Sequence, residues 1–175
     1  GTGARSVTIG FIGLTLRGTG QIVSPDGIRG LHFADEADTA NALIPRLRAA
    51  GADAIVLLIH QGGATTGGYD DKSCPGLTGD IVPILDRLDP SVDVVVSGHT
   101  HKSYVCDYGR MNPARPFLLT SAGQYGTLLT HIVLDIDPIA GRILSKRADN
   151  IIVQSEGYRG AQGDIAKSDR YPALP

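Results

Sequence analysis

Three of the five histidines of this 175-residue chain follow directly after two strongly apolar segments. His60 follows the run 54–59 (AIVLLI), and His99 and His101 follow the run 92–96 (VDVVV) after one Ser-Gly pair. Uninterrupted apolar runs of this kind are typical of buried parallel strands, and ligands bind beyond the carboxyl ends of such strands. Neutral imidazole is the commonest protein ligand of transition metals and suits zinc, manganese or iron. The pattern therefore predicts a metal site built from these three histidines.

The remaining candidates for chemistry are weaker. His32 and His131 each stand alone, in a loop and in an alternating segment, and are interpreted as structural residues. The glycine-rich stretches 18–20 and 62–68 lack the spacing of phosphate-binding loops. Ser97 does not lie in a G-x-S-x-G elbow, so it is interpreted as a turn residue rather than a nucleophile.

The elements that must position these histidines change character along the chain. The first half alternates strands and helices, which predicts parallel strands joined by right-handed crossovers: 7–12, a helix from 35 to 50, 54–59, a helix over 80–88, and 92–96. The second half contains strands separated only by turns: 103–108, 116–121, 128–137 and 142–153. The sequence therefore predicts an α/β fold in which parallel βα units pass into an antiparallel meander. A long Gly/Thr/Pro-rich excursion over 18–30 is expected to be a functional or packing loop.

The composition excludes several classes of protein. Hydrophobic residues make up 42% of the chain, and the formal net charge is −2. That balance is typical of a globular domain, and the absence of any basic run argues against a nucleic-acid polymer as partner. No apolar stretch approaches the ~18 residues that a membrane-spanning helix needs. We therefore expect a globular domain without a membrane span.

Two cysteines, Cys74 and Cys106, leave two interpretations open. Each lies in a polar, turn-rich segment at a similar distance beyond one of the two histidine motifs. They are either two unrelated thiols or, if the histidine motifs converge in space, a disulfide. A disulfide would imply an oxidising compartment.

The histidine motifs also carry a resemblance to a known family. The segment Gly98-His99-Thr100-His101 resembles the GHxH motif of calcineurin-like metallophosphoesterases. More specifically, the chain is similar to the secreted bacterial 5′-nucleotidase and 2′,3′-cyclic-nucleotide phosphodiesterase family. Four further segments support this in the right order: GFIGLT (10–15), DEADTAN (35–41), IHQGG (59–63) and TSAG (120–123). The resemblance implies the C-terminal half of a four-layer αββα metallophosphoesterase sandwich.

The resemblance also implies a ligand set and a chemistry. In that family His60 and His99 would bind one metal ion, and His101 would bind a second. The cofactors would be two divalent ions, Zn, Mn or similar, which activate water for attack on a phosphate ester. Many family members carry cysteines where Cys74 and Cys106 fall, which supports the disulfide and a periplasmic or secreted location.

Several parts of the family pattern do not occur in this sequence. The upstream D-x-H, GDxxD and GNH[ED] motifs supply a bridging Asp, an Asn ligand and the catalytic His, so this chain is expected to hold no catalytic residue of its own. Residues 1–154 are then the C-terminal part of the catalytic domain, and residues 155–175 are a linker toward a missing C-terminal substrate-binding domain. Gln61 stands where the family frequently has Glu.

The expected activity belongs to the intact protein. It would hydrolyse a nucleotide or other phosphate ester, as a 5′-nucleotidase-like phosphatase or a cyclic-nucleotide phosphodiesterase, with the missing N-terminal half as partner and this chain alone inactive. Two alternatives are a non-enzymatic metal-binding or interaction module derived from a phosphoesterase, and a mononuclear zinc hydrolase. The last requires His60, His99 and His101 to surround one point.

Overall fold

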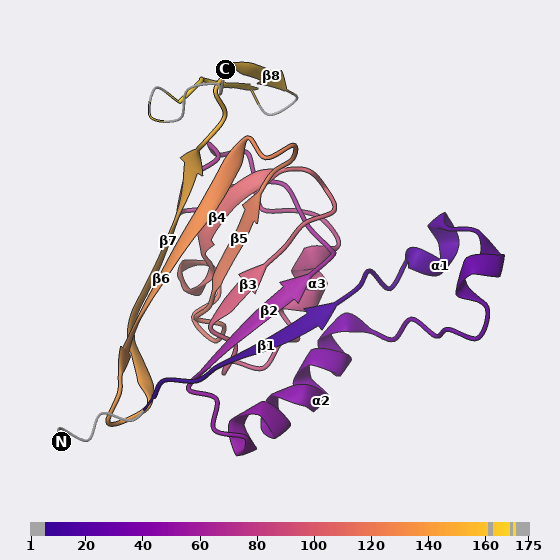
Figure 1. Ribbon diagram of the computed structural model, residues 1–175, viewed down its shortest axis with the longest axis vertical. Coiled ribbons are helices and arrows are strands. Elements are labelled where there is room, and N and C mark those ends of the chain that lie inside the picture. Colours follow the sequence, from indigo (N-terminus) through magenta and orange to yellow (C-terminus); the bar gives the residue numbers. More distant parts are fainter. Residues whose placement is uncertain (1–5, 161–162, 169, 171–175) are drawn as a thin grey trace.

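The computed structural model describes residues 6–160, 163–168 and 170 (Figure 1). Along the chain, its strands, α-helices and short 3-10 helices (η) are β1 (Ile9–Leu14), α1 (Thr19–Ile22), η1 (Pro25–Ile28), α2 (Glu36–Ala49), β2 (Ala54–Ile59), α3 (Ile81–Leu85), β3 (Val94–Val96), β4 (Ser103–Asp107), η2 (Tyr108–Arg110), β5 (Leu118–Ala122), β6 (Leu128–Asp137), β7 (Arg142–Ile152), β8 (Tyr158–Gly160) and β9 (Gly163–Ile165).

The main sheet has five strands in the order β1-β2-β3-β5-β4. β1, β2, β3 and β5 are parallel, and only β4 runs antiparallel, beside β5. The α/β fold class is confirmed, but the expected antiparallel meander is only partly correct, because β5 returns to lie parallel beside β3. Leu118 and Leu119 point to opposite faces of β5 and both are buried, so this strand gains more apolar burial inside the sheet than at its edge.

Helices α2 and α3 cover one face of the sheet. α2 begins at an N-cap, Asp35, whose carboxylate accepts a hydrogen bond from the backbone N–H of Asp38. α3 is shorter than the expected 80–88 and ends at Leu85. The core between these helices and the sheet is apolar and is formed by residues such as Ala37, Ala40, Ile44, Ile55, Leu57, Ile59, Ile81, Leu85 and Val95.

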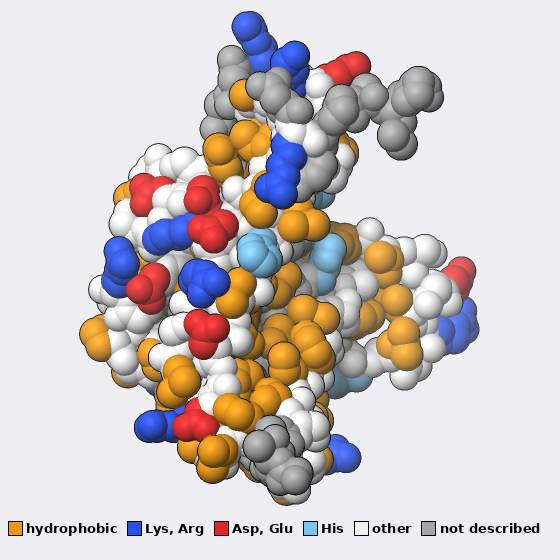
Figure 2. All heavy atoms as spheres, turned by 60° about the vertical axis from the view of Figure 1, so that its left-hand side comes forward, with side chains coloured by type: hydrophobic (Ala, Val, Ile, Leu, Met, Phe, Trp, Pro, Cys, Tyr) orange, Lys and Arg blue, Asp and Glu red, His pale blue; other side chains and the backbone are white. Residues whose placement is uncertain are grey.

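The opposite face of the sheet is only half covered. The β6–β7 hairpin forms a separate two-stranded sheet that packs over β4 and β5 and buries Val94, Val105 and Leu118. Toward β1 the face stays open, and Phe11 is 60% exposed there. Figure 2 shows hydrophobic side chains gathered in a continuous area on this side of the molecule. A groove of about 520 Å³ runs between β6 and the strands β1, β2 and β3, and the residues that line it are apolar.

The last part of the chain carries a small hairpin, β8–β9. The side chain of Gln154 donates hydrogen bonds to the carbonyls of Ile165 and Ala166, which holds the hairpin beside the end of β7. This hairpin lies in the stretch expected to be a linker, of which residues 161–162, 169 and 171–175 lie outside the described residues. Within the described part of the chain, no helix has the length and apolar character needed to cross a membrane.

Candidate metal site at the carboxyl edge of the sheet

His60 and His99 come together at the carboxyl edge of the sheet. His60 directly follows β2, and its backbone N–H bonds to the carbonyl of Leu14, so the strand ladder fixes its position. His99 lies on the loop after β3. The two imidazole centroids are 5.1 Å apart with an interplanar angle of 62°, and both residues are exposed. The expected convergence of these two histidines is therefore observed.

The backbone of the GHTH loop is unusual at both histidines. His99 has φ 65° and His101 has φ 59°, values in the left-handed region that non-glycine residues rarely adopt. Each such residue costs about 1–2 kcal/mol. The surrounding contacts must hold this conformation, which presents two imidazoles from one short loop.

Two glycine-rich loops are locked together beneath the histidines. The Gly98 N–H bonds to the carbonyl of Gln61, and the Thr100 hydroxyl donates to the carbonyl of Gly63 at 2.7 Å. A Cβ on Gly62 would lie 2.1 Å from the carbonyl oxygen of Gly98, so only glycine fits this crossing. The loop that carries His60 and the loop that carries His99 thus form one rigid unit.

A buried polar network supports this unit from below. The hydroxyls of Ser97 and Tyr104 lie 2.6 Å apart, and Ser97 also donates to the carbonyl of Thr120. The Tyr104 oxygen accepts a hydrogen bond from the Gly63 N–H. Burial raises the pKa of the Tyr104 phenol, so this group stays protonated. Ser97 is fully engaged in these contacts, which agrees with its interpretation as a structural residue.

Cys74 and Cys106 form a disulfide. It joins the loop after β2 to β4, and both residues are buried. Of the two interpretations left open by the sequence, the bonded pair is the one observed. With a sequence separation of 32 residues, closing this loop in the unfolded chain stabilises the fold by roughly 3–4 kcal/mol.

His101 lies beside an aromatic ring. Its ring is 6.4 Å from the ring of Tyr125, which also has a positive φ and follows β5. Among the described residues no three His, Cys, Asp or Glu side chains are placed to hold a single metal ion. This arrangement does not favour the mononuclear alternative.

The donor chemistry of the histidines fits divalent transition metals. His60 and His99 are exposed, adjacent and held by a rigid backbone, and neutral imidazole is a good ligand for such ions. Two imidazoles leave most coordination positions open, so further ligands would have to come from elsewhere. The metal-binding role of the three histidines remains a prediction.

Two features near the site could not be predicted from the sequence. Tyr125 stands beside His101 between two glycines that read only as a turn, Gly123 and Gly126. His99 also lines a large cavity together with the excursion after β1. Both features arise from contacts between segments that are distant in the sequence, so no local sequence pattern predicts them.

Comparison with protein-family models gives no match. Among proteins related in sequence, the chain is 26% identical over 147 residues to the endonuclease YhcR of Bacillus subtilis, which covers 84% of this chain and 11% of that protein. It is 33% identical over 101 residues to the cell wall protein Lmo0130 of Listeria monocytogenes, covering 55% of this chain and 13% of that protein. The chain thus spans little more than a tenth of the length of these relatives.

Solved structures share the fold over most of the chain. A protein of Staphylococcus aureus described as a 5′-nucleotidase superposes with a TM-score of 0.61 at 22% identity, over 83% of this chain and 27% of that one. The calcineurin-like phosphoesterase YfkN of Bacillus subtilis gives 0.62 at 18% identity, over 85% and 46%. The fold is therefore that of part of a calcineurin-like phosphoesterase. The more particular resemblance, to the C-terminal part of 5′-nucleotidase-like proteins, is confirmed at the level of the fold.

Proposed function

We propose that this chain is the C-terminal part of the catalytic domain of a metal-dependent enzyme that hydrolyses phosphoesters of nucleotides. The enzyme would act as a 5′-nucleotidase-like phosphatase or a cyclic-nucleotide phosphodiesterase. The observation that carries this proposal is the adjacent pair His60 and His99, rigidly held at the carboxyl edge of a sheet with the fold of phosphoesterases. The names of the neighbours and of the endonuclease relative support phosphoester hydrolysis as the general chemistry.

In this proposal His60 and His99 hold one divalent ion, and His101 contributes to a second. Such ions lower the pKa of bound water and neutralise charge on phosphate oxygens. The chain's own contribution is orientation, because the left-handed backbone at His99 and His101 fixes where the imidazole nitrogens point. The contact between Gly62 and Gly98 keeps His60 and His99 in one relative position.

The remaining machinery belongs to other parts of the intact protein. The motifs that supply the bridging carboxylate, the amide ligand and the general acid do not occur in this sequence. We assign residues 1–154 to the catalytic domain and residues 155–175 to a connection toward a substrate-binding domain. The isolated chain is accordingly inactive, and its partners are the N-terminal half of the domain and the nucleotide.

The disulfide and one relative indicate where the protein works. A disulfide persists in oxidising compartments, and a relative is a cell wall protein. We place the protein outside the cytoplasm, in a periplasmic or secreted location.

Metal binding by the isolated chain tests the ligand assignment without activity. Mn²⁺ or Zn²⁺ titrated into the chain and followed by calorimetry should bind weakly, because only part of the ligand set is present. We expect His60→Ala or His99→Ala to weaken this binding by at least about tenfold, because each removes one of two ligands. His131→Ala, an exposed histidine on β6, is the matched control and should leave it unchanged. Equal binding by all variants would refute the assignment.

The alternative is a non-enzymatic metal-binding or interaction module, and the absence of the upstream motifs from this sequence favours it. A measurement of hydrolytic activity distinguishes the enzyme from this module. The longer natural polypeptide should hydrolyse 5′-AMP or 2′,3′-cyclic AMP with added Mn²⁺ and lose turnover on His99→Ala. The 175-residue chain should show none. A longer polypeptide that binds metal through these histidines without turnover on any nucleotide would favour the module.

A further inference from the structure

The backbone of Gly63 connects the segments that carry the candidate metal ligands. Gly63 follows His60 by three residues in the loop after β2. Its N–H donates to the Tyr104 hydroxyl at 3.1 Å, and its carbonyl accepts a hydrogen bond from the Thr100 hydroxyl at 2.7 Å. Thr100 belongs to the GHTH loop (98–101), and Tyr104 follows that loop by three residues. Both polar groups of the Gly63 backbone are therefore held by the segment that carries the other two histidines.

The Tyr104 hydroxyl also contacts the end of β3. The Ser97 hydroxyl lies 2.6 Å from it, and Ser97 precedes His99 by two residues. Ser97 donates its single hydroxyl proton to the Thr120 carbonyl at 2.8 Å, so in the contact between the two hydroxyls Tyr104 is the donor. The Tyr104 oxygen thus accepts from Gly63 and donates to Ser97. One buried hydroxyl links the segment before His99 to the loop after β2.

The position of β4 relative to this loop is fixed by a covalent bond. In the main sheet, β3 and β5 separate β2 from β4 (Figure 1). The loop after β2 nevertheless reaches β4, where Cys74 is bonded to Cys106. Tyr104 precedes Cys106 by two residues and is 0% exposed. The disulfide therefore holds the distal part of the loop, while the Tyr104 hydroxyl holds the part nearest His60.

The surroundings of Gly63 are tightly packed. Gly63 is buried, and an added Cβ there would lie 2.3 Å from the carbonyl oxygen of Thr78. A buried N–H that loses its acceptor disfavours the conformation in which it lies. Removal of the Tyr104 oxygen is therefore expected to shift the Gly63 backbone, and His60 lies only three residues away on the same loop.

We propose that Tyr104 and Thr100 are positioning residues of the metal site, which set the placement of His60 relative to His99 by holding the backbone of Gly63. Tyr104 is fully buried, so it acts through the backbone and binds neither metal nor substrate. The inference rests on the proposed function for the identity of the ligand. The hydrogen bonds that carry it do not depend on a bound metal.

Tyr104→Phe tests the hydroxyl alone, because it removes one oxygen and keeps the ring. In the metal-free chain the imidazole centroids of His60 and His99 lie 5.1 Å apart, close enough for a nuclear Overhauser effect between their ring protons. Tyr104→Phe should weaken this effect. It should also weaken Mn²⁺ binding, measured by calorimetry, by about tenfold, the lower end of what loss of a group that orients metal ligands costs.

Tyr108→Phe is the matched control. Tyr108 is also buried, and its hydroxyl donates to Asp86 at 2.8 Å rather than to a histidine loop. Loss of this hydrogen bond should lower stability but leave the Overhauser effect and the Mn²⁺ affinity unchanged. The inference would be overturned if Tyr108→Phe weakened both readouts as much as Tyr104→Phe does, because general destabilisation would then explain the change.

Thr100→Val tests the other contact of Gly63, and it does so even if Tyr104→Phe fails to fold. It replaces a hydroxyl by a methyl group and removes the hydrogen bond to the Gly63 carbonyl. Both readouts should weaken, whereas Thr100→Ser, which keeps the hydroxyl, should retain them. Readouts of Thr100→Val equal to those of wild type would contradict the inference.

The two readouts keep this inference apart from the metal assignment. If the wild-type chain binds no Mn²⁺ while the Overhauser effect depends on Tyr104, the metal assignment fails and the positioning role holds. If Mn²⁺ binds through His60 and His99 with the same affinity in wild type, Tyr104→Phe and Thr100→Val, the metal assignment holds and the positioning role is wrong.

Discussion

The left-handed backbone conformation of His99 and His101 lowers the stability of the folded state at the candidate site. A glycine at position 99 would adopt φ 65° without the steric penalty that an imidazole-bearing residue meets there. We therefore predict that His99→Gly raises the free energy of unfolding by about 1 kcal/mol while it weakens metal binding as much as His99→Ala does. Urea denaturation and calorimetry on the same variant measure both effects.

The control for this trade-off is His131→Gly. His131 lies in β6 with extended backbone, where glycine lowers stability because it adds freedom to the unfolded chain. A destabilised His99→Gly would mean that the imidazole contacts contribute more than the backbone conformation costs.

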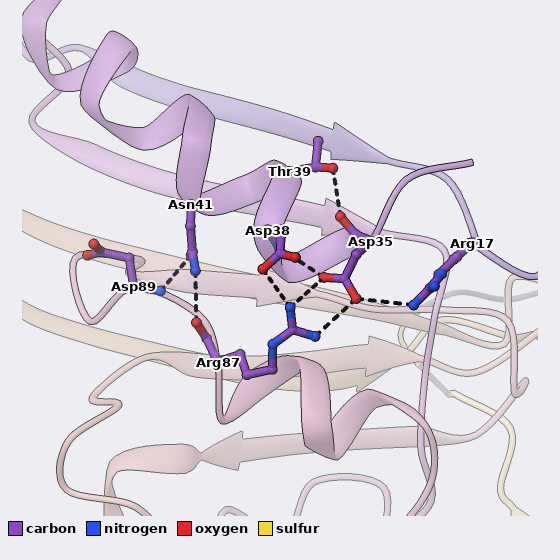
Figure 3. Close-up of polar contacts among 7 residues, drawn as sticks. All are labelled: Arg17, Asp35, Asp38, Thr39, Asn41, Arg87 and Asp89. Carbon is purple, nitrogen blue, oxygen red and sulfur yellow. Dashed lines mark hydrogen bonds and ion pairs between the residues drawn. The ribbon is translucent and has the colours of Figure 1, made fainter. Parts of the chain in front are cut away.

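At the scale of elements, one ion-pair cluster joins the start of α2 to the turn after α3 (Figure 3). The Asp35 carboxylate accepts hydrogen bonds from the two terminal guanidinium nitrogens of Arg87, and it also caps the N-terminus of α2. Hydrogen bonding to Arg87, followed by that from the Asp38 N–H, lowers the pKa of Asp35 below its ordinary value of 3.8. Because the folded state holds this proton less tightly, the cluster stabilises the fold above pH 3.8, and this stabilisation is lost as the pH falls through the lowered pKa.

We therefore predict that Arg87→Ala lowers the urea midpoint at pH 7 and that the difference from wild type shrinks below pH 3.8 and in 1 M salt. Arg29→Ala is the matched control. Arg29 pairs with Asp26 in an isolated, exposed pair, and its loss should change the midpoint little at any pH. A difference for Arg87→Ala that is the same at all pH values would show that packing, and not charge, is responsible.

At the scale of the whole molecule, the half-covered sheet is the feature from which we expect association in solution. The open face exposes Phe11, Leu58 and the apolar groove beside β6, and contiguous apolar area of this kind promotes association. We predict that the chain associates with rising concentration, and that the double variant Phe11→Ser/Leu58→Ser reduces both association in sedimentation velocity and binding of a hydrophobic dye.

Ile139→Ser is the comparison for this prediction, since Ile139 is 85% exposed but stands alone in the turn between β6 and β7. It should leave association unchanged. A monomeric wild-type chain with no dye binding would show that the open face is covered in solution.

Local signals explain which parts of the fold could be predicted. The helix that begins near residue 35, the apolar strand before His60, and the strand over 128–137 each depend on neighbouring residues, and the structure matches them closely. The placement of β5 between β3 and β4 depends on competition for central positions in the sheet, which no local pattern records. The proximity of His60 and His99 was predictable, because each follows a strand of the same parallel sheet. The contact of Tyr125 with His101 and the cavity that His99 and Phe33 line were not predictable, because they depend on the tertiary fold.

The crossing of Gly62 and Gly98 also has a consequence for how this protein can change over generations. A side chain at position 62 would collide with backbone, which cannot rotate away, so the two loops cannot drift independently. In a library of all single substitutions, position 62 should tolerate none, whereas position 13, where an added Cβ meets no atom within 4 Å, should tolerate many. Any descendant that rearranges one histidine loop must therefore inherit a compensating change in the other.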